Sequence, residues 1–212
     1  MVVRKDIDNF IKTIPADVHL VAVTKYVDTC VMKEFLNHQI FAFGERKVDE
    51  LLLKKRLLND ERVVWHFIGH LQTNKVKNVV NEIDYLHSLD SIKLAKTLSK
   101  YRKGKKLNCF IEVSINNEES KFGLKIEEVE SFIKEAITLP NLKIIGFMMM
   151  SKKDSTHQSL LEQFQKLKEL KENVNKKFNL NLQELSMGMS EDYKEAIQEG
   201  ATYIRLGTIL YE

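Results

Sequence analysis

The sequence predicts an α/β fold, a single (β/α)8 TIM barrel that occupies residues 1–212 as one domain. Short apolar runs alternate with charged stretches of helical periodicity almost from end to end, a pattern typical of parallel strands joined by helices. There are eight such runs, and eight strands in about 200 residues favour a closed barrel. An open doubly wound sheet is the alternative. No linker rich in Pro, Gly or Ser, low-complexity tract or repeat divides the chain.

The first predicted element is an extra helix over residues 2–13, where charged and apolar residues recur at helical spacing. The apolar runs that predict strands are 19–25, 40–45, 63–69, 85–90, 107–115, 142–150, 182–188 and 203–210. The stretches that predict connecting helices are 28–38, 46–58, 71–81, 91–103, 126–138, 157–177 and 190–199. The last strand ends the pattern. We therefore expect the N-terminal helix to cover the barrel where an eighth helix would otherwise lie.

Composition excludes several classes of protein. The net charge is 33 minus 30, or +3, and is spread along the chain, which does not favour a nucleic-acid or membrane partner. Cys30 and Cys109 are too few for a disulfide framework, and neither resembles a metal ligand. The N-terminal residues lack the apolar core of a signal peptide, and the run 144–150 is too short to cross a bilayer. We expect a soluble, cytoplasmic protein.

Lys25 closes the first apolar run. An amine held at the end of a buried strand can leave water, lose its proton and attack a carbonyl, which is how a lysine forms a Schiff base. A lysine at a strand end is also commonly a solvated edge residue. Barrel enzymes place their chemistry at the carboxyl ends of the strands, and Lys25 ends the first of them. Position and chemistry together make Lys25 a candidate Schiff-base residue.

Small polar residues cluster at the ends of the seventh and eighth strands, where barrels commonly bind phosphate. Ser186 offers a hydroxyl, Gly188 permits close backbone approach, and Ser190 can N-cap the next helix. Gly207 and Thr208 offer backbone N–H groups and a second hydroxyl. Each glycine alone is equally typical of a turn. The two clusters together predict a phosphate site.

Arg205 lies inside the apolar run 203–210. A guanidinium there needs a partner or a cavity that contains one. By strand parity Arg205 shares a face with Gly207, so it could point at the ligand whose phosphate lies at 207–208. The alternative is an outward arginine paired with an acidic residue on a covering helix.

Six ordered motifs span nearly the whole chain. They are VAVTK at 21–25, FGE at 43–45, WHFIGHLQTNK at 65–75, SKFG at 120–123, LSMGMS at 185–190, and EGA at 199–201 running into IRLGT at 204–208. In these motifs the sequence resembles the pyridoxal 5′-phosphate (PLP) homeostasis proteins. The resemblance implies the barrel of fold-type III PLP enzymes, of the alanine racemase N-terminal domain type, without a second domain.

The resemblance also implies roles for six cofactor-binding residues. Lys25 would form the internal aldimine with PLP, and Arg205 would face the pyridine nitrogen. The phosphate would be held by Ser186, Met187, Gly207 and Thr208. No catalytic residue and no metal ligand is predicted.

One position departs from the pattern of the family. The family usually has Asn and then Tyr after its Phe-Gly-Glu, whereas Arg46 and Lys47 follow here. Because the Asn is expected near the cofactor, the contact from the second strand is open. Arg46 either adds a charge near the ring hydroxyl or points to solvent.

Three further patterns predict structure more than chemistry. His66 and His70 are four residues apart but do not share a helical face, which argues against a zinc site. The basic stretch 72–77 is typical of a solvated helix face, and the resemblance alternatively places it at the pocket entrance. The methionines at 148–150 are expected to fill the barrel interior, because methionine adapts to irregular gaps.

Two function classes remain. The first is a PLP carrier that holds the cofactor on Lys25 without appreciable catalysis and is therefore not an enzyme. The second is a PLP-dependent amino-acid racemase, which needs an acid or base on each face of the substrate. The racemases that this chain resembles take the second group from an added β domain, for which 212 residues leave no room. We therefore favour the carrier.

A third class, a Schiff-base aldolase acting on sugar phosphates, would explain a lysine with a phosphate site but not the six motifs. The expected protein is a monomer whose partners are PLP and, as candidate recipients, PLP-dependent apoenzymes. The sequence leaves open whether PLP is delivered or only buffered.

Overall fold

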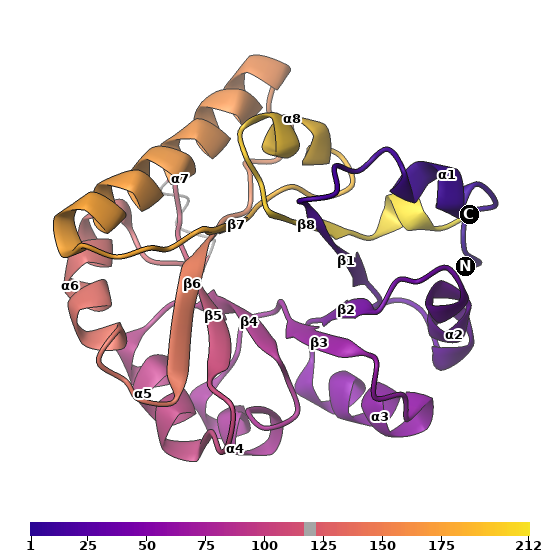
Figure 1. The fold of residues 1–212 in the computed structure, drawn as a ribbon, viewed down its shortest axis with the longest axis horizontal. Helices are drawn as coiled ribbons and strands as arrows, with labels where there is room; N and C mark the ends of the chain where they lie inside the picture. The colour runs from indigo at the N-terminus through magenta and orange to yellow at the C-terminus, as the bar shows by residue number, and fades with distance from the viewer. Residues whose placement is uncertain (117–121) are drawn as a thin grey trace.

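Eight parallel strands close into a barrel in the computed structural model, which describes residues 1–116 and 122–212. The strands follow one another around the barrel in chain order, and β1 pairs with β8 (Figure 1). The strands are β1 His19–Val23, β2 Ala42–Glu45, β3 Val64–Phe67, β4 Tyr85–Leu89, β5 Leu107–Glu112, β6 Leu142–Met148, β7 Glu184–Ser186 and β8 Tyr203–Leu206. This closure confirms the predicted barrel and excludes the open sheet.

Helices surround the barrel and alternate with its strands (Figure 1). They are α1 Ile7–Ile11, α2 Thr29–Asn37, α3 Val48–Leu58, α4 Val76–Val79, α5 Ile92–Tyr101, α6 Ile126–Ala136, α7 His157–Phe178 and α8 Tyr193–Gln198. Two short 3-10 helices are η1 Thr73–Lys75 and η2 Thr208–Leu210. Ser120 and Lys121 of the SKFG motif lie outside the described residues.

The predicted extra helix is present but shorter than residues 2–13. Val3 forms an antiparallel bridge with Tyr211, and the helix α1 begins only at Ile7. It lies in the ring of helices between α8 and α2 (Figure 1). Phe10 of α1 packs edge-on against Tyr193 of α8, with ring centroids 6.0 Å apart. The helix therefore occupies the expected place of an eighth helix.

Several predicted elements are too long. The runs 19–25, 182–188 and 203–210 leave the sheet at Val23, Ser186 and Leu206, because their last residues form the loops over the carboxyl end of the barrel. The predicted helix 71–81 is instead η1 followed by the single turn α4. Its buried Val76, Val79 and Val80 are β-branched and favour a long helix less than straight-chain residues do.

Two apolar clusters form the core. The larger lies between the sheet and the helices and includes Phe35 of α2 and Phe164 of α7. The smaller is built only from strand residues inside the barrel, namely Val21, Phe110, Met148 and Tyr203.

The prediction for the three methionines is right only for Met148. Met149 packs in the outer cluster, and Met150 is 38% exposed. The reason is strand geometry, since successive side chains point to opposite faces and the strand ends at Met148.

Across residues 1–116 and 122–212, no helix has both the length and the apolar character needed to cross a membrane.

Candidate cofactor site

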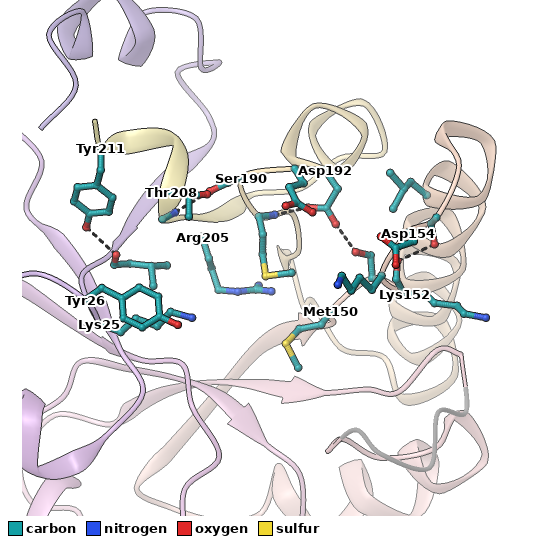
Figure 2. Close-up of a pocket in the computed structure, with 18 of the residues that line it drawn as sticks. Lys25, Tyr26, Met150, Lys152, Asp154, Ser190, Asp192, Arg205, Thr208 and Tyr211 are labelled. Carbon is teal, nitrogen blue, oxygen red and sulfur yellow. Dashed lines mark hydrogen bonds between the residues drawn. The ribbon is translucent and has the colours of Figure 1, made fainter. Parts of the chain in front are cut away.

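A cavity of about 500 Å³ opens at the carboxyl ends of the strands. Its walls come from the segments that follow β1, β6, β7 and β8, and Figure 2 shows side chains from all four. Lys25 and Tyr26 lie on one side, Lys152 and Asp154 lie on the other, and Arg205 lies between them (Figure 2). Of the six predicted site residues, the structure brings Lys25, Arg205, Gly207 and Thr208 together on this lining.

Lys25 lies two residues after the end of β1 and is half-buried on the cavity wall. Its Nζ lies 4.6 Å from the centroid of the Tyr26 ring. The hydroxyl of Tyr211, another lining residue, donates to the carbonyl oxygen of Val23 at 2.8 Å. The next helix begins at once, with Asp28 capping α2 by accepting from the backbone N–H of Cys30. Lys25 therefore lies in a short segment that is held on the strand side by Tyr211 and on the helix side by the N-cap of α2.

Arg205 points into the barrel, which excludes the outward alternative. Its guanidinium donates to Ser186 Oγ at 2.5 Å and to the carbonyl oxygen of Met149 at 2.9 Å. Burial lowers the pKa of Arg205 to about 10, while the negative charges of Asp192 and Glu112 act in the opposite direction. At neutral pH the guanidinium is therefore a cation, and it reaches the cavity from the interior of the barrel.

Ser186 joins Arg205 to a buried chain of histidines. His87 Nδ1 lies 2.8 Å from Ser186 Oγ, and His87 Nε2 lies 2.9 Å from His66 Nδ1. Burial lowers the pKa of His66 to about 3, aided by His19, and holds the pKa of His87 well below its ordinary value. Both rings are therefore neutral. Because Ser186 accepts from Arg205, its own hydrogen is available to His87.

Glu112 adds a carboxyl group to this interior. Burial and, to a smaller extent, the charge of Asp90 raise its pKa, the charge of Arg205 lowers it, and the net result is a pKa of about 7. Near pH 7 the group is close to half-protonated. The cation of Arg205 thus faces a partly neutralised acid rather than a full counter-ion.

Ser190 connects the two loops of the predicted phosphate site. Its Oγ accepts from the backbone N–H groups of Gly207 at 3.1 Å and Ile209 at 3.3 Å. The backbone N–H groups of Ser190 and Thr208 donate to no acceptor in the described parts of the chain. The Thr208 side chain is exposed at the cavity. This corner therefore presents unused donors to a ligand.

Ser186 and Met187 are fully buried and lie off the cavity lining. Ser186 faces the interior beneath Arg205, and Met187 packs in the outer core. Their role as phosphate ligands stays a prediction that this placement does not favour. Gly188 has φ +94° and approaches α8 rather than a ligand, because an added Cβ would lie 2.7 Å from the Cβ of Ala196.

The remaining patterns lie away from the cavity. Arg46 is exposed and does not line the cavity. Of the two alternatives for this residue, the structure therefore shows the one that points to solvent. His70 stacks on Phe122, whereas His66 is inside the barrel. Gln72, Thr73 and Asn74 line a separate hollow of about 360 Å³ rather than the entrance of this cavity.

Sequence reasoning missed several residues of the site. Tyr211, Lys152 and Asp192 line the cavity, and His87 supports Arg205 from inside the barrel. Lys152 and Asp192 follow strand ends, a signal that could have singled them out. Nothing in the sequence marks His87, because its partner Ser186 is 99 residues away.

Comparison with known proteins shows the family of the chain. The family model described as the alanine racemase N-terminal domain matches residues 3–212. The pyridoxal phosphate homeostasis proteins of Synechocystis and Aquifex aeolicus are 39% and 37% identical to the chain, over 95% and 91% of its length and 94% and 85% of theirs.

Solved structures also match nearly the whole chain. PipY of Synechococcus elongatus, in a structure with PLP bound, matches 98% of this chain and 99% of its own with a TM-score of 0.91 and 28% identity. Alanine racemase of Corynebacterium glutamicum, at 14% identity, shares only the fold, with a TM-score of 0.79 over 96% of this chain and 59% of its own. The chain therefore belongs to the alanine racemase N-terminal domain family and, within it, to the pyridoxal phosphate homeostasis proteins.

Proposed function

We propose that this protein binds PLP in the cavity, holds it as a Schiff base on Lys25, and serves PLP homeostasis without appreciable catalysis. The observation that carries the proposal is the convergence of Lys25, Arg205 and the loop at Thr208 on one cavity. The names of the relatives and the PLP-bound neighbour support it.

The donor set fits the chemistry of PLP. A half-buried amine suits an aldehyde, a buried cation suits an unprotonated ring nitrogen, and the unused donors at Ser190 and Thr208 suit a phosphate. When bound, PLP supplies an aldehyde that condenses with an amine, so that a C=N bond forms and the carbonyl oxygen leaves as water.

The residues of the chain divide the remaining work. Lys25 supplies the amine, and the hydroxyl of Thr208 with the neighbouring N–H groups orients the phosphate. Arg205 can only donate, so it keeps the ring nitrogen an acceptor and weakens the ring as an electron sink. A racemase tolerates such an arginine too, so the carrier is favoured chiefly because racemisation needs a second acid or base on the far face of the substrate, for which the sequence offers no evident residue.

The test is a visible spectrum followed by borohydride trapping. With PLP, the protein should show an imine band near roughly 420 nm, and reduction should leave a pyridoxyl group on Lys25. Lys25→Ala should lose both and keep its fold, whereas Lys47→Ala, which removes a surface amine paired with Glu50, should keep both. A pyridoxyl group on Lys152 instead would contradict the assignment.

The same assay compares PLP with pyridoxal, which lacks the phosphate. Several charge-assisted hydrogen bonds of about 1.5–3 kcal/mol each should make PLP bind more than about a hundredfold more tightly. Equal affinities would remove the phosphate site.

A further inference from the structure

A buried ion pair lies directly behind Lys25. Lys54 Nζ of α3 donates to Glu45 Oε1 at 2.7 Å and to the carbonyl oxygen of Thr24 at 2.7 Å. The hydroxyl of Thr24 donates to the same Glu45 oxygen at 2.6 Å. Glu45 and Thr24 are fully buried, and the Lys54 side chain is 12% exposed. The main chain and the side chain of Thr24 are therefore both bound by one pair of charges.

This contact controls the peptide that carries Lys25. β1 ends at Val23, so Lys25 lies beyond the last paired residue of its strand. The Thr24 carbonyl also accepts from the Val27 N–H at 3.1 Å, and the Thr24 N–H donates to Gly44 at 3.1 Å. The carbonyl of the Thr24–Lys25 peptide is thus fixed from two sides. Its orientation sets the direction in which the Lys25 side chain leaves the backbone.

Stability alone explains the pair poorly. Removing two charges from water costs several kcal/mol each, and apolar replacements of buried ion pairs are often neutral or stabilising. Glu45 Oε2 is moreover the one buried side-chain nitrogen or oxygen, among the residues described, that has no hydrogen-bond partner. An unsatisfied buried oxygen is a further cost. The fold tolerates these costs at the point where Lys25 leaves the sheet.

We propose that Glu45 and Lys54 are positioning residues that aim Lys25 into the cavity by fixing the Thr24–Lys25 peptide. Both lie off the described lining of the cavity, so they act through Thr24 rather than on a ligand. The proposal rests on the proposed function, in which Lys25 carries the Schiff base.

The first experiment measures how fast PLP, added to cofactor-free protein, gives a borohydride-trapped group on Lys25. Lys54→Met and Glu45→Gln should each slow trapping by about tenfold or more, and the double variant should be no slower than about the worse single one, because both break one interaction. Lys55→Met is the matched control. Lys55 lies on the same helix and also binds a carbonyl and a carboxylate, those of Glu82, but at the surface. Its variant should trap at the wild-type rate.

The second experiment needs no cofactor. The Val27 N–H is bonded to the carbonyl that Lys54 holds, so its hydrogen exchange should be about tenfold faster in Lys54→Met than in the wild type and unchanged in Lys55→Met. A purely stabilising pair would instead speed exchange throughout the barrel.

The outcomes separate the two proposals. A folded Lys54→Met that traps PLP on Lys25 at the wild-type rate overturns the positioning role. If Lys54→Met unfolds, Glu45→Gln decides, since its amide keeps one oxygen for the Thr24 hydroxyl but removes the negative charge that pairs with Lys54. If the wild type forms no adduct on Lys25, the proposed function fails, and Val27 exchange still tests the contact with Thr24.

Discussion

Arg205 brings a positive charge into the barrel, and the two groups to which its guanidinium donates are uncharged. Ser186 is a hydroxyl, Met149 offers a carbonyl, and the histidines beyond Ser186 are neutral. A neutral histidine next to a buried guanidinium avoids repulsion between like charges. The polar interior therefore fixes Arg205 in place and leaves its charge to act on the cavity.

These histidines predict acid sensitivity. In the folded protein His66 titrates at about 3 against an ordinary value of 6.5, and the pKa of His87 is also lowered by burial. At a pH between the folded and the unfolded pKa of a histidine, the unfolded chain binds more protons than the folded protein does. The free energy of unfolding therefore falls as the pH falls, by at most about 1.4 kcal/mol per pH unit for each histidine. Glu112 has the opposite effect, because its pKa rises from an ordinary value of 4.5 to about 7 on folding. Between these two values its protonation stabilises the folded protein as the pH falls, which offsets the effect of one of the two histidines.

Urea unfolding at about pH 7.5 and about pH 5.5 measures the effect. The wild type should lose on the order of 1 kcal/mol, and His87→Gln, which does not titrate, should lose clearly less. His157→Gln, at an exposed residue paired with Glu195, should behave like the wild type. Identical losses in wild type and His87→Gln would show that the interior histidines do not set the acid limit.

At the scale of elements, the loop between β7 and α8 determines the shape of the phosphate corner. Gly188 has φ +94°, and its carbonyl oxygen accepts from the backbone N–H of Arg205 at 2.9 Å. Only the absence of a Cβ lets α8 approach, since that atom would lie 2.7 Å from Ala196 Cβ and 3.0 Å from Tyr193 Cα. The position of Ser190 between the two loops depends on this approach.

Gly188→Ala and Gly200→Ala form a matched pair. Both residues have φ +94°, but a Cβ on Gly200 would meet nothing within 4 Å. Each variant should lose about 1–2 kcal/mol of stability to backbone strain, and Gly188→Ala should lose a further 1–3 kcal/mol, roughly, to overpacking. Urea unfolding measures these losses. Titration with PLP should show a weakened affinity only for Gly188→Ala. Equal effects at the two sites would mean that α8 adjusts freely.

At the scale of the whole molecule, the barrel has the fold of the alanine racemase N-terminal domain, and the proposed function is to hold PLP in its cavity rather than to turn over a substrate. We expect L-alanine to exchange slowly with a Schiff base on Lys25 but not to racemise, because racemisation needs a stabilised carbanion and a proton donor on the far face of the substrate. Arg205 leaves the ring a weak electron sink, and the sequence offers no evident residue for the donor. Chiral chromatography after prolonged incubation measures it. Turnover of about 1 per second or more, absent from Lys25→Ala, would replace the carrier with a racemase.

Much of this arrangement follows from the sequence, because the barrel repeats one unit and its chemistry lies at strand ends. The eight apolar runs predicted the strand order. Lys25, Gly207 and Thr208 were identifiable near strand ends, and Arg205 was identifiable as a charge inside an apolar run. Ser186 and Met187 were harder to place, since β7 has only three residues and the face of each depends on where it ends. The contacts of His87 with Ser186 and of Lys54 with Glu45 join separate elements, and no local pattern reports them.

The pairing of β1 with β8 also bears on how the protein is made. Val21 and Arg205 are register partners, although 184 residues separate them in the chain. A ribosome therefore releases Lys25 long before Arg205 and Thr208 are synthesised, and the seam between the first and last strands is a contact of very high sequence separation, which forms slowly. A nascent chain consequently exposes Lys25 without the rest of the cavity lining, and the cavity is complete only after the last strand has joined the sheet.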